Sequence, residues 1–126
     1  MNRHVATASR ILLGLIFTIF GANGFLNFIP VPPMPENVTA FMTGVMVAPY
    51  FMPLIKACEV FSGILLLMNK QVPLALLILA PISIQIFLFH AYLTPGMENL
   101  LMPTVLLCLG ITVAMSRWAK FRPLFT

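Results

Sequence analysis

Long apolar stretches separated by short polar breaks make up almost the whole chain. Four of them run from Ser9 to Phe28, from Pro49 to Met68, from Val72 to Leu93 and from Asn99 to Trp118. Because a helix of about 20 residues crosses a hydrocarbon core about 30 Å thick, each stretch predicts a membrane-spanning helix. The expected fold class is all-α, a transmembrane four-helix bundle.

A shorter apolar segment lies between the first two stretches. It runs from Pro35 to Ala48 and follows a turn rich in proline. Apolar segments of about 10–14 residues are typically interfacial or re-entrant rather than spanning, so we expect this one to be interfacial or re-entrant. The first stretch resembles a signal peptide, because Arg3 and Arg10 precede its apolar part, but that part is too long and no small-residue cleavage site follows. We expect it to be retained.

Composition supports a membrane protein. The chain has 126 residues, of which 60% are hydrophobic and 8% charged, and its mean hydropathy is +1.02. A soluble domain of this size needs more polar surface, so we expect the lipid bilayer to be the solvent. The length and the lack of a linker predict one domain over residues 1–126.

The distribution of basic residues predicts the orientation. Six of the seven Lys and Arg residues fall on one side of four spans, namely Arg3, Arg10, Lys70, Arg117, Lys120 and Arg122. The other two loops contain no Lys or Arg. Under the positive-inside rule, both termini are expected in the cytoplasm, in a multi-pass protein of the cell (inner or plasma) membrane. Orientation and contact with anionic headgroups explain the net charge of +4, so no nucleic-acid partner is expected.

Two charged residues lie inside the second span. Lys56 and Glu59 are three residues apart, so they share one face of a helix. Each alone would cost about 2.5–3.5 kcal/mol in hydrocarbon on insertion scales, whereas a pair neutralises itself. We expect the pair to face the bundle interior or a cavity. Gly63 continues the same face, and Gly14, Gly21 and Gly24 mark the first span; we expect these glycines to let helices approach closely.

Further polar side chains fall at a similar depth, in the outer half of the expected bundle. The candidate ligand-binding or proton-handling residues from three helices are Lys56, Glu59, Asn23, Asn27, Gln85 and His90. They predict a polar pocket open to the outer face, with the Pro35 to Ala48 segment as its roof. Gln85 and His90 are about 140° apart on an ideal helix, so both point inward only if Pro81 kinks the helix.

Each candidate also has a structural explanation. The Lys56 and Glu59 pair would then only fix the helix in register, His90 would reach headgroups or water, and the asparagines would link helices. No Cys, His and carboxylate cluster has metal-ligand spacing, and Cys58 and Cys108 do not form a redox motif. Phosphate-binding glycine loops and nucleophile elbows are absent. The sequence therefore contains no self-contained catalytic motif and no metal site.

A family resemblance can be given on particular residues. Arg10 to Gly14 with Phe17, Gly21 and Phe25, then Leu54 to Lys56 with Glu59 and Gly63, and finally Pro73 to Ala75 resemble the DoxX family of small four-helix membrane proteins. The resemblance extends from Arg10 to about Leu93. It implies redox work at a quinone-containing membrane, in which partner proteins supply the cofactors.

Two functional interpretations stay open at this point. In the first, the chain is a redox-linked accessory subunit of an oxidoreductase complex that binds a quinone or a small sulfur compound in the outer pocket, with Phe20, Phe61, Phe87 and Phe89 as its apolar wall. No covalently bound cofactor is expected. In the second, it is a non-enzymatic binding, assembly or small-solute and lipid handling module in which Lys56 and Glu59 are a structural clamp. Membrane or peripheral oxidoreductase subunits and a second copy of the chain are the protein partners considered.

Overall fold

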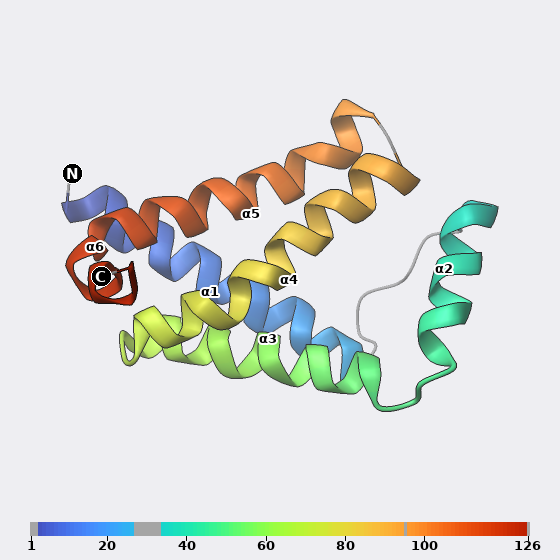
Figure 1. Ribbon diagram of the computed structural model, residues 1–126, viewed down its shortest axis with the longest axis horizontal. Helices are drawn as coiled ribbons and strands as arrows, with labels where there is room; N and C mark the ends of the chain where they lie inside the picture. Colours follow the sequence, from blue (N-terminus) through green and yellow to red (C-terminus); the bar gives the residue numbers. More distant parts are fainter. Residues whose placement is uncertain (1–2, 27–33, 95, 126) are drawn as a thin grey trace.

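The computed structural model describes residues 3–26, 34–94 and 96–125, and every regular element in these ranges is a helix. Four long helices form the bundle in Figure 1: α1 (Arg3–Leu26), α3 (Phe51–Met68), α4 (Val72–Leu93) and α5 (Met97–Ser116). A short helix, α2 (Glu36–Met46), stands at one end of the bundle. The last elements are α6 (Trp118–Phe121) and the 3₁₀ helix η1 (Arg122–Phe125).

The four predicted spans are confirmed, with shifted ends. Among the described residues, α1, α3, α4 and α5 are long and apolar enough to cross a membrane. Helix α1 begins at Arg3 instead of Ser9, because helical hydrogen bonding extends beyond the apolar stretch into polar residues. Helix α3 begins at Phe51 instead of Pro49, since the chain is still in a turn at Tyr50. Large apolar side chains are exposed on all four helices, as lipid contact requires.

The segment between the first two spans is the helix α2, which has 11 residues. At a rise of 1.5 Å per residue it is about 17 Å long, too short to cross a core about 30 Å thick. At the opposite end of the bundle from α2, helix α6 follows α5 directly and Phe121 is buried. The sequence did not predict that the chain packs back onto the bundle there.

The long helices form a ring in which α1 and α4 each pack against both α3 and α5. Both ends of the chain lie at the same end of the bundle, which we call the terminal half; the half beside α2 is the distal half (Figure 1). The buried apolar core belongs mainly to the terminal half and consists of Leu13, Phe17, Leu66, Val72, Ala75, Leu76, Leu79, Leu106, Val113 and Phe121. Tight packing is therefore concentrated away from α2.

Glycines bring α1 and α3 into close contact, as the sequence predicted. A Cβ atom added to Gly14 would lie 3.0 Å from the carbonyl oxygen of Gly63, and one added to Gly21 would lie 2.8 Å from Val60 Cγ2. The two backbones approach so closely that a side chain at these positions would separate them. Interfaces of this kind are favoured in membranes, because lipid supplies no hydrophobic drive between helices and association depends on close packing.

The turn from α3 to α4 is fixed by its backbone and by Arg10. Asn69 has a left-handed φ of 56°, and the N–H groups of Asn69 and Lys70 donate to the Leu66 and Leu65 carbonyls, which is a Schellman ending. The guanidinium of Arg10 donates to the Leu66 carbonyl oxygen. A cation at the negative end of the helix dipole stabilises the end of α3.

We expect Gly63→Ala to lower the free energy of unfolding by about 1–3 kcal/mol, the usual cost of overpacking. The new Cβ would lie 2.8 Å from the Thr18 backbone nitrogen and 2.9 Å from the Gly14 carbonyl oxygen, so the helices must move apart. Gly44→Ala is the matched control, because a Cβ there meets no atom within 4 Å. Reversible unfolding in mixed micelles, followed by circular dichroism, measures both variants. Equal stabilities would contradict the close contact.

Candidate functional site

A cavity of about 590 Å³ lies in the distal half, between α2, α3 and α4. Its wall is mostly apolar, and four polar side chains interrupt it: Lys56, Glu59, Gln85 and His90. The structure thus brings four of the six predicted site residues to one place, from two neighbouring helices. Lys56 and Glu59 of α3 are at least 26 residues away in the chain from Gln85 and His90 of α4.

Lys56 and Glu59 form an ion pair within α3. The Lys56 Nζ atom lies 3.5 Å from Glu59 Oε2. The Glu59 side chain is only 5% exposed and that of Lys56 is 24% exposed, so the carboxylate is enclosed and the ammonium is the more accessible partner. In a medium without water each charge needs the other, because an unpaired buried charge costs several kcal/mol.

The first span positions both members of the pair. A Cβ added to Gly24 would lie 2.5 Å from Lys56 Cγ and 2.7 Å from Lys56 Cδ, so the aliphatic part of Lys56 lies against the bare backbone of α1. A Cβ added to Gly21 would lie 3.0 Å from Glu59 Cβ. The glycines predicted as packing residues therefore also hold the charged pair in place.

Gln85 and His90 both line the cavity, although they are far apart around an ideal helix. The residues of α4 at the cavity are Pro81, Ile82, Gln85, Ile86, Phe89 and His90, which cover about half of its circumference. The cavity is wide enough to reach both edges of this face. His90 Nδ1 lies 2.8 Å from the Ile86 carbonyl oxygen, which can only accept, so Nδ1 carries a proton. In a neutral imidazole, Nε2 is then the nitrogen that accepts a hydrogen bond.

Helix α2 forms the roof that the sequence predicted, through Phe41, Met42 and Val45. Phe41 packs edge-to-face on Phe89 of α4, with ring centroids 5.2 Å apart. The side-chain amide of Asn37 donates to the Leu93 carbonyl oxygen at 2.7 Å. These two contacts attach α2 to the last turns of α4.

Asn23 and most of the predicted phenylalanine wall lie away from the cavity. Asn23 is half-buried on α1 and is not among the described residues at the wall, and Asn27 lies outside the described residues. Of the predicted phenylalanine wall, Phe89 is correct. Phe20 and Phe61 are more than 40% exposed and lie elsewhere, and the cavity takes Phe41 and Phe51 instead. The usable signal for Phe89 is its spacing, because it is four residues from Gln85 and so on the same face of the helix.

The chemistry available is that of hydrogen bonding and proton exchange. Among the described residues, no group of three or more His, Cys, Asp or Glu side chains is placed to hold a metal ion. The cavity offers an ammonium, an amide and an imidazole beside apolar and aromatic surface. Such a wall suits a largely apolar ligand with a few polar atoms.

Comparison with known families identifies the chain's relatives. The model of the DoxX family matches residues 5–91, which is more than half of the chain. The chain belongs to the DoxX family. The match includes the whole of α2 and α3 and ends within α4, so it contains every residue that lines the distal cavity of this DoxX protein. No curated protein and no solved structure matches the chain.

Family membership and the four apolar helices together establish this DoxX protein as a multi-pass integral membrane protein in contact with the lipid bilayer. The resemblance seen in the sequence is thereby confirmed. The matched segment starts two residues after the beginning of α1, whereas the resemblance was expected to begin at Arg10.

Asn37→Asp is expected to loosen the roof. The substitution keeps the Oδ1 that accepts the Val38 N–H at 2.9 Å, but it removes the donor to Leu93. Because a hydrogen bond contributes about 0.5–1.5 kcal/mol, amide exchange in α2 should become roughly two- to tenfold faster. Thr43→Ala is the control, since its hydroxyl donates within α2 to the Thr39 carbonyl oxygen. Hydrogen–deuterium exchange with mass spectrometry reads both; similar exchange of residues 38–46 in Asn37→Asp and wild type would refute the attachment.

Proposed function

We propose that this protein is a redox-linked membrane subunit that binds a quinone or a small sulfur compound in the distal cavity. The observation that carries the proposal is the placement of Lys56, Glu59, Gln85 and His90 on the wall of one mostly apolar cavity. Its volume of about 590 Å³ falls within the range of about 300–1,000 Å³ that is usual for small-molecule sites.

Lys56 is the residue that meets the ligand's polar end. Its ammonium has three protons and faces Glu59 at 3.5 Å, so donors remain for a ligand oxygen or sulfur. Gln85 is exposed at the wall and adds an amide that both donates and accepts. His90 accepts through Nε2 when neutral. A quinone, whose carbonyl oxygens accept hydrogen bonds, matches the donors of Lys56 and Gln85.

The aromatic side chains support a flat ligand. Phe41, Phe51 and Phe89 come from three different helices and line the same cavity. Aromatic rings favour offset or edge-to-face contacts with other rings, with centroids about 4.5–7 Å apart. A quinone ring would be held by these walls while its polar atoms reach the α3 and α4 side chains.

Proton exchange is the role proposed for the pair, and electron supply is left to a partner. Reduction of a quinone takes up two protons and two electrons. The ion pair holds one transferable proton, on the Lys56 ammonium, so we assign to Lys56 and Glu59 the delivery of the two protons one at a time, with the pair taking up a proton from water between the two steps. The electrons come from a membrane or peripheral oxidoreductase subunit, as the family resemblance implies.

The proposed orientation has both termini in the cytoplasm. Four basic residues lie at the terminal end of the bundle, namely Lys70, Arg117, Lys120 and Arg122. Glu36 and Glu98 lie in the first turns of α2 and α5, at the distal end. By the positive-inside rule, the basic end faces the cytoplasm. The membrane that we assign is the cell inner membrane. The distal cavity then lies in the outer half of the bilayer.

A second function is supported by one specific observation. Glu59 is almost fully enclosed and Lys56 lies against Gly24, so the pair also has the features of a structural clamp. In that case the protein is a non-enzymatic binding or assembly module. The two functions make opposite predictions for the same variants.

A short-chain benzoquinone should stabilise the wild type and not Glu59→Gln. A ligand that binds only the folded state at a hundred times its Kd raises the free energy of unfolding by about 2.7 kcal/mol. Glu59→Gln keeps the shape of the side chain but removes the charge that holds Lys56. Thermal unfolding of each protein in detergent, with and without the quinone and with thiosulfate in a parallel arm, measures the effect.

The clamp predicts another result for the same set. Neither ligand would stabilise the wild type, and both Lys56→Met and Glu59→Gln would be destabilised without any ligand. The double variant would recover part of the loss, because neither charge is then left unpaired. This outcome would overturn the ligand-binding proposal and leave a structural role for the pair.

A fluorescent protein fused after Thr126 should fluoresce, and alkaline phosphatase fused after Gly96 should be active, in a bacterial host. The first reporter matures in the cytoplasm and the second only outside it, so the pair tests the orientation that the basic residues predict. As a control, the two reporters are exchanged, and both signals should disappear. Activity of the exchanged pair would reverse the orientation.

A further inference from the structure

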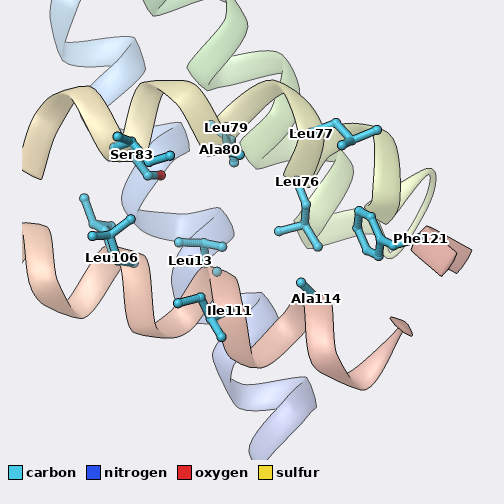
Figure 2. A pocket seen from close by; sticks show the side chains of 13 residues that line it. Leu13, Leu76, Leu77, Leu79, Ala80, Ser83, Leu106, Ile111, Ala114 and Phe121 are labelled. Carbon is cyan, nitrogen blue, oxygen red and sulfur yellow. The ribbon is translucent and has the colours of Figure 1, made fainter. Parts of the chain in front are cut away.

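A second cavity lies in the terminal half and is independent of the proposed ligand site. It has a volume of about 330 Å³, and α4 and α5 form its sides while Leu13 of α1 forms its floor. Figure 2 shows Leu76, Ala80, Leu106 and Ile111 around it, with Phe121 at the terminal end. Ser83 is its one polar side chain among the described residues. This groove, which we call the α4–α5 groove, therefore suits hydrocarbon.

The groove has the length and the opening that a lipid chain needs. It extends over residues 76–84 of α4 and 106–114 of α5, which is about 12 Å at 1.5 Å per residue. One leaflet of the hydrocarbon core is about 15 Å thick, so the groove crosses most of one leaflet. Leu77 and Ile111 on its walls are 48% and 62% exposed, and a Cβ added to Gly110 would meet no atom within 4 Å. The groove is open to the surrounding lipid.

Unpaired positive charge lies at the terminal end of the groove. Lys120 and Arg122 flank Phe121 in the chain and are exposed, and their side chains make no hydrogen bond or ion pair with the described residues. The neighbouring Arg117 differs, because its guanidinium donates to Asn69 Oδ1 at 2.5 Å. Arg122 also lines a shallow hollow with Trp118, Ala119 and Pro123. A headgroup-sized space thus adjoins free cations.

We propose that the α4–α5 groove and the free cations Lys120 and Arg122 form a binding site for one anionic phospholipid. An acyl chain lies in the groove, and the phosphate is held by the lysine ammonium and the arginine guanidinium. Charge-assisted hydrogen bonds to phosphate are stronger than neutral ones, and the guanidinium binds phosphate oxygens in pairs. The three acidic side chains of the protein, Glu36, Glu59 and Glu98, lie on α2, on the distal part of α3 and in the first turn of α5, so none of them offsets this charge.

The test compares phosphatidylglycerol with phosphatidylcholine of the same acyl chains. Purified protein in a neutral detergent is titrated with each lipid, and native mass spectrometry counts bound lipid while thermal unfolding measures stability. We expect one phosphatidylglycerol to bind the wild type more tightly than phosphatidylcholine does. Lys120→Gln with Arg122→Gln should weaken phosphatidylglycerol about 25-fold, from about fivefold per cation, and weaken phosphatidylcholine much less, because its choline cation offsets the charge of its phosphate.

Gly110→Leu tests the groove itself, since Gly110 lines it and a Cβ there meets no atom within 4 Å. It should abolish the retention of either lipid at the single site. Gly44→Leu is the matched control, because Gly44 is equally open and lies on α2 at the distal end; it gains the same helix propensity and should bind as the wild type does. Equal affinity of the wild type for the two lipids would show annular lipid only and overturn the proposal. An unchanged phosphatidylglycerol preference in the double glutamine variant, whose substitutions are on the surface, would overturn it as well.

Discussion

The close contact between α1 and α3 determines where the charged residues lie. Gly14 meets the backbone of Gly63, and farther along the same contact Gly21 and Gly24 meet Glu59 and the stem of Lys56. Since α3 can approach α1 this closely only on its glycine side, its rotation about its own axis is fixed. The charged pair then lies partly beneath α1 and partly at the cavity. Packing at one end of the contact thus orients ionisable groups at the other.

The packed core and the distal cavity lie in different halves of the bundle. In the terminal half, leucine, valine and phenylalanine side chains from α1, α3, α4 and α5 form the core, and Phe121 closes it. In the distal half the helices enclose a cavity of about 590 Å³ with α2 as its roof. Lipid supplies no hydrophobic drive for helix association, so close packing must hold the helices together. Packing in the terminal half does this, and the distal half can then contain a cavity. The core is in this sense the support of the site.

The sequence predicted the features that have a strong local cause. The four spans follow from their length, and the common face of Lys56 and Glu59 follows from their spacing and from the cost of lone charges in lipid. The prediction of Phe61 and Phe87 at the wall was wrong. Each is two residues from a cavity residue and so lies on the opposite side of its helix, which means that the spacing alone excludes both. The contribution of Phe41, the attachment of Asn37 and the return of Phe121 depend on contacts distant in the chain, which no local pattern encodes.

Hydrogen bonds of Arg10 and Asn37 join elements that are distant in the chain, and both lie at helix ends. The carbonyls of a helix's last turn have no partner in their own helix, and the apolar core of a bilayer offers no water in exchange. At the end of α3, Arg10 adds a second donor to the Leu66 carbonyl, which also accepts the Asn69 N–H. At the end of α4, Asn37 donates to the Leu93 carbonyl. Asn37 also lies in the first turn of α2, so the same hydrogen bond that satisfies the end of α4 attaches the roof of the cavity. Movement of the roof away from α4 must therefore release the Leu93 carbonyl, which costs the last turn of α4 that partner.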